Sequence, residues 1–175
     1  MAKKKVAAII AEIFFICLCL FGLGYSVYRY LLVLNESLTK KEAIAVIAYK
    51  KNNTQRKVKD GDLWDRIQTG SSVYNEDTVR TAPLSEATVD FSGGNVLELY
   101  ENSLAKITVK DDKPDIQIEY GKLNAYSSNT SGMNITSGIM SVNMDKQSSI
   151  SSYTDQNDVT LHVQKGNASI VNTQT

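Results

Sequence analysis

Few residues of this chain have the types and spacing that enzyme chemistry requires. His162, the only histidine, lies among alternating apolar residues and is expected on the face opposite to them. A serine nucleophile needs a sharp, defined turn beside its histidine, and none of the serine-rich segments shows that pattern. We therefore predict that the protein is not an enzyme and has no catalytic residues. A hydrolase that depends on His162 would contradict this prediction.

A metal or cofactor site is not indicated either. The aspartates of segment 60–65 surround a glycine, but their spacing misses the calcium-binding loop, which needs three alternating ligands before the glycine and a distal glutamate. Zinc needs cysteine or histidine ligands, and the two cysteines, Cys17 and Cys19, both lie in the apolar N-terminal run. We predict a polar turn at the aspartates, no metal and no cofactor.

Three residues are candidates for contacts with other molecules. Glu12 is the acidic residue of the apolar run, where a buried carboxylate costs roughly 2.5–3.5 kcal/mol. One interpretation is that Glu12 contacts a basic residue of another helix within the membrane. The alternative is that Glu12 has little function, because it is protonated or reaches toward the N-terminal lysines. Trp64 is expected to be a core or core-edge anchor. The exposed faces around Trp64 and Arg80, with the later hairpins, are expected to carry surface contacts.

The elements that position these residues begin with a membrane anchor. The run 6–34 contains only two charges, Glu12 and Arg29, and about 20 residues suffice to span a bilayer. Lysines 3–5 precede the run, so the positive-inside rule places the N-terminus in the cytoplasm. A cleaved signal peptide is the alternative, but its apolar region would be shorter. We predict a single-pass protein of the inner membrane whose remainder lies in the periplasm or outside the cell.

The remainder is expected to form one domain. It contains 15 basic and 18 acidic residues and no cysteine, so no basic surface for nucleic acid and no disulfide is indicated. The predicted organisation is a cytoplasmic tail, an anchor, a polar stalk and a β-domain, at residues 1–5, 6–34, 35–42 and 43–175.

The pattern of the exported part indicates an all-β domain. The compact apolar run 43–49 fits a first strand that is buried on both faces, and the polar segment 50–60 is expected to be a loop or hairpin end. From Leu63 onward, apolar and polar residues alternate between turn signals such as Ser92-Gly93-Gly94-Asn95. Short antiparallel strands in a β-sandwich or a short β-solenoid-like stack are therefore predicted, after one N-terminal transmembrane helix.

One pattern occurs twice. Ile116-x-Ile118-x-x-Gly121-x-Leu123-x-Ala125 matches Leu161-x-Val163-x-x-Gly166-x-Ala168-x-Ile170 position for position. We interpret the pair as two hairpins of the same type, with glycine at a turn or bulge. A stacked, solenoid-like layer is the alternative interpretation.

A longer series of short motifs resembles a known family. In order, the chain contains Trp64-Asp-Arg-Ile67, Thr69-Gly70, Val73-Tyr-Asn-Glu-Asp77-Thr-Val79-Arg80-Thr81, Ser85-x-Ala87-x-Val89-x-Phe91, Ser92-Gly93-Gly94, Leu97-x-Leu99, Asn102-Ser103 and Ile107. This order and spacing are similar to the FecR domain of bacterial envelope proteins, over about residues 43–170. The resemblance implies an all-β extracytoplasmic domain without catalytic residues.

The resemblance also implies a function. The best-known relatives pass a signal from an outer-membrane receptor to a cytoplasmic sigma factor through a helical domain ahead of their span. Only five residues precede Val6 here, so we do not expect the sigma-regulator role. We expect a non-enzymatic protein-binding or signal-relay module that contacts an envelope protein or a cell-wall component. The alternative is a structural subunit of a larger membrane assembly, and a homo-oligomer fits either function.

Overall fold

The computed structural model describes residues 2–38, 42–138, 140–155 and 158–172, and within the helix it describes the side chains of residues 13–31. The chain divides into two compact units, Met1–Lys41 and Glu42–Thr175.

The first unit is one helix, α1 (Ala2–Leu38). Its stretch Ile13–Leu31 is long and apolar enough to cross a membrane, and every side chain described there is exposed, as lipid-facing side chains would be. The helix continues into the segment predicted as a polar stalk. The side chain of Glu12 lies outside the described residues, so the prediction of an intramembrane contact stays open.

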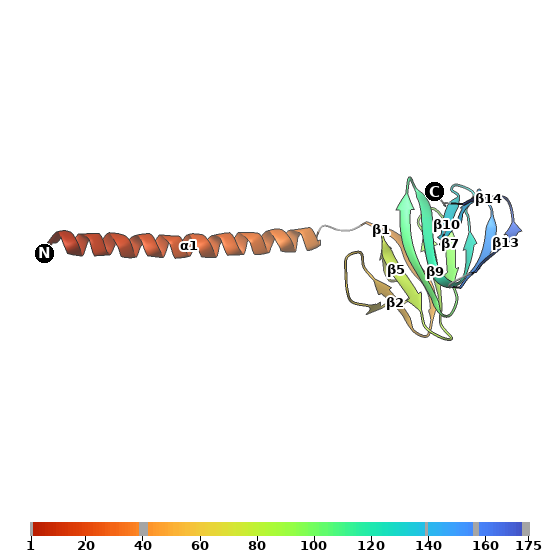
Figure 1. Ribbon diagram of the computed structural model, residues 1–175, viewed down its shortest axis with the longest axis horizontal. Coiled ribbons are helices and arrows are strands. Elements are labelled where there is room, and N and C mark those ends of the chain that lie inside the picture. Colours follow the sequence, from red (N-terminus) through yellow and green to blue (C-terminus); the bar gives the residue numbers. More distant parts are fainter. Residues whose placement is uncertain (1, 39–41, 139, 156–157, 173–175) are drawn as a thin grey trace. The chain divides into compact units, whose positions relative to one another are not determined.

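The second unit is built from strands, which confirms the predicted all-β domain. Among the described residues these are β1 (Ala43–Lys51), β2 (Thr54–Lys57), β3 (Asp65–Arg66), β4 (Ser72–Tyr74), β5 (Asp77–Thr81), β6 (Glu86–Phe91), β7 (Val96–Leu99), β8 (Ser103–Lys110), β9 (Lys113–Tyr126), β10 (Met133–Ser137), β11 (Met140–Met144), β12 (Ser149–Thr154), β13 (Val159–Lys165) and β14 (Ala168–Asn172). Figure 1 shows these strands forming a curled sheet.

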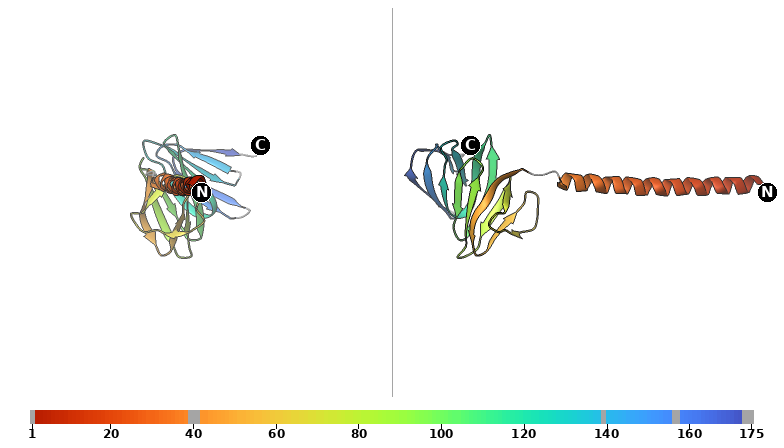
Figure 2. Two further views of the ribbon diagram at one scale, coloured as in Figure 1. Left: turned by 90° about the vertical axis from the view of Figure 1, so that its left-hand side faces the viewer. Right: turned by 180° about the vertical axis from the view of Figure 1, so that it is seen from behind.

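The sheet branches at its longest strand, β9. The first half of β9 pairs with β8 and β10, and the second half pairs with β7 and β12. Two layers result. Layer A runs β4-β1-β6-β7-β9-β12-β13, and layer B runs β3-β2-β5-β8-β9-β10-β11-β14. The first strands and the last strands lie at opposite ends of the domain (Figure 2, right).

The apolar side chains of both layers form one core. Leu97 and Leu99 from layer A and Ile107 and Ile116 from layer B are fully buried in the same cluster. The alternation of apolar and polar residues explains which side chains are buried, because successive side chains of a strand point to opposite faces. On β6, Ala87, Val89 and Phe91 are buried and Asp90 is exposed.

The prediction that the first strand is buried on both faces is wrong. Ala45 and Ile47 of β1 are buried, whereas Val46 and Tyr49 are exposed. The outer face of layer A is open to solvent, so an apolar residue there is not covered. The segment 50–60, expected to be a loop or hairpin end, contains β2.

Gly121 is where β9 passes from one layer to the other. Its φ of +104° lies in the region that favours glycine. A Cβ atom at this position would overlap Oγ and Cα of Ser103 and would lie 2.6 Å from the carbonyl oxygen of Asn102. The serine hydroxyl accepts a hydrogen bond from the Lys122 amide at 3.0 Å, so it holds the crossing in place.

The same contact recurs about 45 residues later. Gly166, with a φ of +79°, lies against Ser148, whose Oγ accepts a hydrogen bond from the Asn167 amide at 3.2 Å. Gly166 again separates two strands of different layers, β13 in layer A and β14 in layer B.

A second pair of contacts is related by nearly the same offset, 45 residues for the donors and 46 for the acceptors. The Ser103 amide donates to Oγ1 of Thr81 at 3.0 Å, and the Ser148 amide donates to Oγ of Ser127 at 2.8 Å. The β-domain therefore contains an internal repeat, from about β5 onward, in which the two layers exchange roles. The interpretation of the twice-occurring pattern as two hairpins is wrong, because each glycine marks a crossing between layers.

Candidate functional site

The outer face of layer A carries a connected polar network. Cross-strand pairing places Glu98 beside Asn124, and Asn124 beside Ser151. The Asn124 amide group donates to the hydroxyl of Tyr100 at 2.7 Å and to the Glu98 carboxylate at 3.2 Å, and Ser151 donates to the Asn124 carbonyl at 2.8 Å. The hydroxyl of Tyr126 donates to Glu98 at 3.4 Å. The hydroxyl of Tyr100 also donates to Glu98, at 3.2 Å, so two tyrosines share the Glu98 carboxylate within an ordered polar surface.

This environment raises the pKa of both tyrosines. Desolvation by burial is the main cause at Tyr100 and at Tyr126, and the negative charge of Glu98 adds to it, because a phenolate beside a carboxylate is unfavourable. The Asn124 amide opposes the increase at Tyr126 by donating a hydrogen bond to its oxygen.

We predict that the two tyrosines ionise above the usual pKa of about 10. The stability that their neutral forms contribute is fully present below that pH and is lost as the pH rises through the folded-state values, because the unfolded chain ionises first. Ultraviolet titration of tyrosinate in Tyr100→Phe and Tyr126→Phe variants assigns the two groups. Glu98→Gln should lower both pKa values and Glu119→Gln neither. A Glu98→Gln titration identical to that of the unmodified protein would contradict the prediction.

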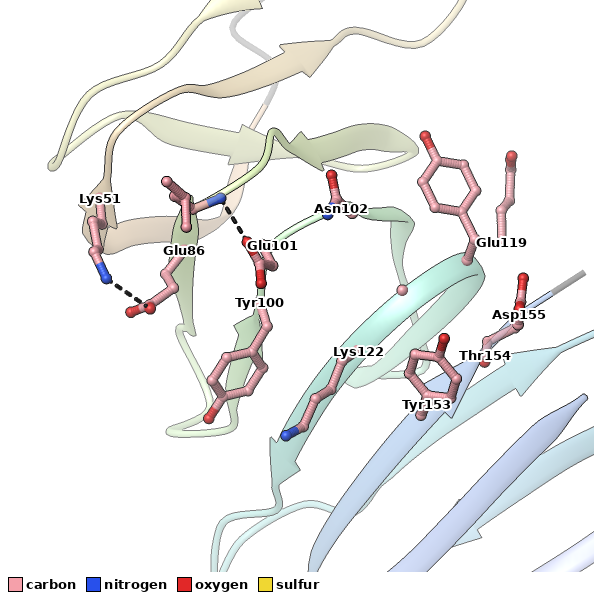
Figure 3. Close-up of a pocket in the computed structure, with 13 residues that line it drawn as sticks. Lys51, Glu86, Tyr100, Glu101, Asn102, Glu119, Lys122, Tyr153, Thr154 and Asp155 are labelled. Atoms are coloured by element: carbon pink, nitrogen blue, oxygen red, sulfur yellow. Dashed lines mark hydrogen bonds and ion pairs between the residues drawn. The ribbon is translucent and has the colours of Figure 1, made fainter.

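Beside this network lies a groove of about 770 Å³, a size typical of ligand pockets. It forms at the crossing of β9, and the end of β1, the start of β6, the turn between β7 and β8, and the end of β12 complete it (Figure 3). Its lining residues are Lys51, Leu84, Glu86, Tyr100, Glu101, Asn102, Glu119, Tyr120, Gly121, Lys122, Tyr153, Thr154 and Asp155.

The groove combines aromatic rings with an excess of negative charge. It is lined by three tyrosines, four carboxylates and two lysines. One lysine, Lys51, is paired with Glu86 at 3.1 Å, and the other, Lys122, lies over the ring of Tyr100 with Nζ 5.0 Å from the centroid. Both lysines are thus engaged within the domain, while Tyr120 and Tyr153 expose much of their surface. The arrangement favours a cationic ligand that can stack on tyrosine.

The rim of the groove contains a residue in an unusual backbone conformation. Leu84 has a φ of +57°, and its side chain is 72% exposed. Its amide donates to the Glu101 carboxylate at 2.7 Å, and its carbonyl accepts from the Asn52 side chain at 2.5 Å, so both backbone groups are held. Leu84 follows Pro83 in a β-turn that the Ser85 amide closes by donating to the Ala82 carbonyl at 3.2 Å, and a turn of this kind with proline at its second position accounts for the positive φ. The turn places the exposed leucine side chain at the rim of the groove.

The structure brings the predicted contact residues Trp64 and Arg80 together. The guanidinium carbon of Arg80 lies 4.0 Å from the centroid of the Trp64 ring, and Lys57 Nζ approaches the same ring at 5.7 Å. Arg80 also donates to the Gln55 side chain at 2.8 Å. Trp64 is half-buried just before β3, at the edge of layer B and outside the core cluster. That this patch binds a partner stays a prediction.

The other chemistry-bearing residues are not gathered. His162 is exposed on β13, and the cysteines are exposed on α1 within the candidate span. Within the part of the chain that the structure describes, no three histidine, cysteine, aspartate or glutamate side chains lie close enough to hold a metal ion.

The groove could not be predicted from the sequence, because its lining comes from separate segments of the chain. The available signal was the position of the tyrosines: Tyr100 and Tyr120 flank the Asn102-Ser103 turn and the β9 crossing, and Tyr153 lies on an outward face of β12.

Comparison with known proteins gives little about function. No protein-family model matches the chain, and no solved structure matches it. An uncharacterised protein of Treponema pallidum (strain Nichols) is 24% identical over 150 residues, which cover 84% of this chain and 22% of that protein. The chain thus spans about a fifth of the length of this relative.

Proposed function

We propose that the protein is a membrane-anchored, non-enzymatic binding or signal-relay module of the bacterial envelope. Its β-domain would lie on the extracytoplasmic side, and the groove would hold a basic, partly apolar segment of another envelope protein. The apolar helix behind lysines 3–5, the FecR-like order of motifs and a relative in a bacterium support this placement.

The observation that carries the proposal is the groove itself. Its four carboxylates outnumber its two lysines, Lys51 and Glu86 pair with each other, and exposed tyrosines lie beside Glu119 and Asp155, so the groove keeps an excess of negative charge. A basic side chain of a partner can therefore stack on a tyrosine while it faces a carboxylate. Leu84 adds an apolar contact at the rim, which favours a protein segment over a purely polar polymer.

A peptide probe tests the groove. We expect a fluorescent peptide of alternating arginine and leucine to bind the full chain in mild detergent, and a peptide of alternating glutamate and leucine not to bind. Tyr153→Ala should weaken binding by about tenfold or more, since buried aromatic contacts often contribute at least 1–2 kcal/mol. The matched control is Tyr49→Ala, because Tyr49 is 50% exposed, Tyr153 is 51% exposed, and Tyr49 is outside the groove.

Leu84→Gly separates binding from folding. Glycine accepts a positive φ without strain, so we expect the free energy of unfolding to stay the same or rise while peptide binding falls. Equal binding of the two peptides, or equal losses from the Tyr49 and Tyr153 substitutions, would overturn the proposed site.

The second candidate function is that of a structural subunit of a membrane assembly. It is favoured by a different observation: within the described part of the β-domain, β13 and β14 each pair with a neighbour on one side only.

A further inference from the structure

Within residues 42–138, 140–155 and 158–172, the last strands have fewer neighbours than the strands that correspond to them in the repeat. In the internal repeat, β14 corresponds to the second half of β9, and β11 corresponds to β7. The second half of β9 is flanked by β7 on one side and β12 on the other. Among the described residues, β14 pairs with β11 alone. In the second half of β9, one edge pairs with β7 and the other with β12. The edge of β14 that corresponds to the second of these, the one that pairs with β12, is therefore open.

Layer A ends in the same way. β13 corresponds to the first half of β9, which is flanked by β8 and β10. In the described part of the chain, β13 pairs only with β12. In each layer the last described strand is thus paired on one side only, and β14, β13 and β12 lie together at the end of the domain drawn in blue (Figure 2, right).

Apolar side chains are exposed at this end. Ile118 is buried, and its counterpart in the repeat, Val163, is 42% exposed. Ala125 is buried, and its counterpart Ile170 is 58% exposed. Val163 lies opposite buried Ile150, and Ile170 lies opposite buried Val142, so both point to the core side of their layers. No strand among the residues that the structure describes covers these two core-side positions.

The opposite end of the domain is protected against strand addition. Its edge strands are short, since β3 has two residues and β4 has three, and both residues of β3, Asp65 and Arg66, are charged and exposed. Short and charged edges are the usual means of preventing edge-to-edge pairing. β14 has five residues, Ala168-Ser-Ile-Val-Asn172, with neither charge nor proline.

We propose that the open end joins a second copy of this chain, with β14 of each copy paired antiparallel to β14 of the other. In a two-fold pair, each residue of β14 lies close to the same strand of the other copy, so charged side chains would repel their own counterparts. β14 has no charged residue, so this repulsion is absent. In an antiparallel pair, directly opposite side chains lie on the same face of the sheet. The core-side Ile170 of one copy therefore extends the apolar core face of the other copy.

The choice of a second copy also follows from which edges are available. Within the described part of another copy, β12 already has neighbours on both sides, and β3 and β4 are too short to cover β14. β13 of another copy is also open, but it carries Lys165, whereas β14 carries no charge and its pairing with itself keeps the two copies equivalent. Anchoring by α1 would hold copies on one membrane and raise their effective concentration. This interface is separate from the groove, whose lining includes no residue of β13 or β14.

Sedimentation velocity of the full chain in mild detergent tests the interface. We expect a dimer whose dissociation constant rises at least tenfold in Ile170→Lys, because the substitution places like charges across the two-fold axis. Val46→Lys is the matched control, since Val46 is 41% exposed and lies on β1, between β6 and β4. Dimerisation through α1 alone would leave both variants dimeric, and this result or a monomeric unmodified protein would overturn the proposal.

A cross-linking experiment covers the case in which Ile170→Lys fails to fold. In a chain with Cys17→Ser and Cys19→Ser, oxidation should join Ile170→Cys to its own copy in membranes and leave Val46→Cys monomeric. A cross-link from position 170 to a different polypeptide, or equal cross-linking at both positions, would contradict pairing of like strands.

Discussion

Replacing Gly121 by alanine will unfold most of the β-domain, with an expected loss of stability of about 4 kcal/mol or more. Two effects add at this position. Alanine at a φ of +104° is strained, and its Cβ would overlap backbone and side-chain atoms of Ser103. The overlap cannot be relieved by a rotamer change, because Cα of Ser103 and the carbonyl of Asn102 are part of the backbone.

The position of Gly121 makes the effect global. β9 contributes to both layers, so a shift at the crossing disturbs its pairing with β7, β8, β10 and β12 together. Urea unfolding of the full chain in mild detergent, followed by the fluorescence of Trp64, measures the change. Trp64 is a suitable reporter because it is the only tryptophan and belongs to the β-domain.

Gly70→Ala is the matched control. Gly70 also has a positive φ, +86°, but a Cβ there would meet no atom within 4 Å. It therefore isolates the conformational strain, for which we expect a loss of about 1 kcal/mol. If the two alanine substitutions cost the same, the close approach of Ser103 does not govern the crossing.

Replacing Asp77 by alanine is expected to cost about 3 kcal/mol, the second large effect. Asp77 is buried, accepts a hydrogen bond from the Tyr74 amide at 2.9 Å, and lies 3.6 Å from Nε of Arg56. Arg56 is itself largely covered and lies over the Tyr74 ring at 5.5 Å. Removal of the carboxylate leaves a buried positive charge and the amide of a tight turn without this acceptor.

The control for Asp77 is an ion pair at the surface. Asp115 contacts Lys110 at 3.1 Å, and the lysine is largely exposed, so Asp115→Ala should cost less than about 1 kcal/mol. Asp77→Asn should fall between the two, since an amide keeps an acceptor for the Tyr74 amide and loses the charge. The same urea titration measures all three, and a loss at Asp77 no larger than at Asp115 would show that the buried pair is not important for stability.

Local patterns predicted the elements well. The apolar run of the N-terminal region is a helix long enough to span a membrane, and the alternating segments after it are strands. The turn predicted at Ser92–Asn95 joins β6 and β7, with Gly94 at a φ of +78°. These predictions depend on a residue and its near neighbours, and local sequence encodes that information.

The errors occurred where burial depends on distant partners. Residues 43–49 are apolar throughout, and only the open outer face of layer A determines that Val46 and Tyr49 are exposed. The repeated glycine pattern was visible, but its meaning as a crossing depends on Ser103 and Ser148, which approach from other strands. The tyrosines of the groove come from β9, β12 and the turn after β7, and no spacing along the chain predicts that they meet.

By itself, the sequence determined that this protein has an apolar helix and an all-β domain, because length, hydropathy and period-two alternation act within a few residues. Only the tertiary structure decided that β9 serves two layers, that the groove forms at its crossing, and that β14 pairs on one side only within the described part of the chain. Strand pairing joins segments far apart in the chain, and each register is selected by the burial of whole faces rather than by any local pattern.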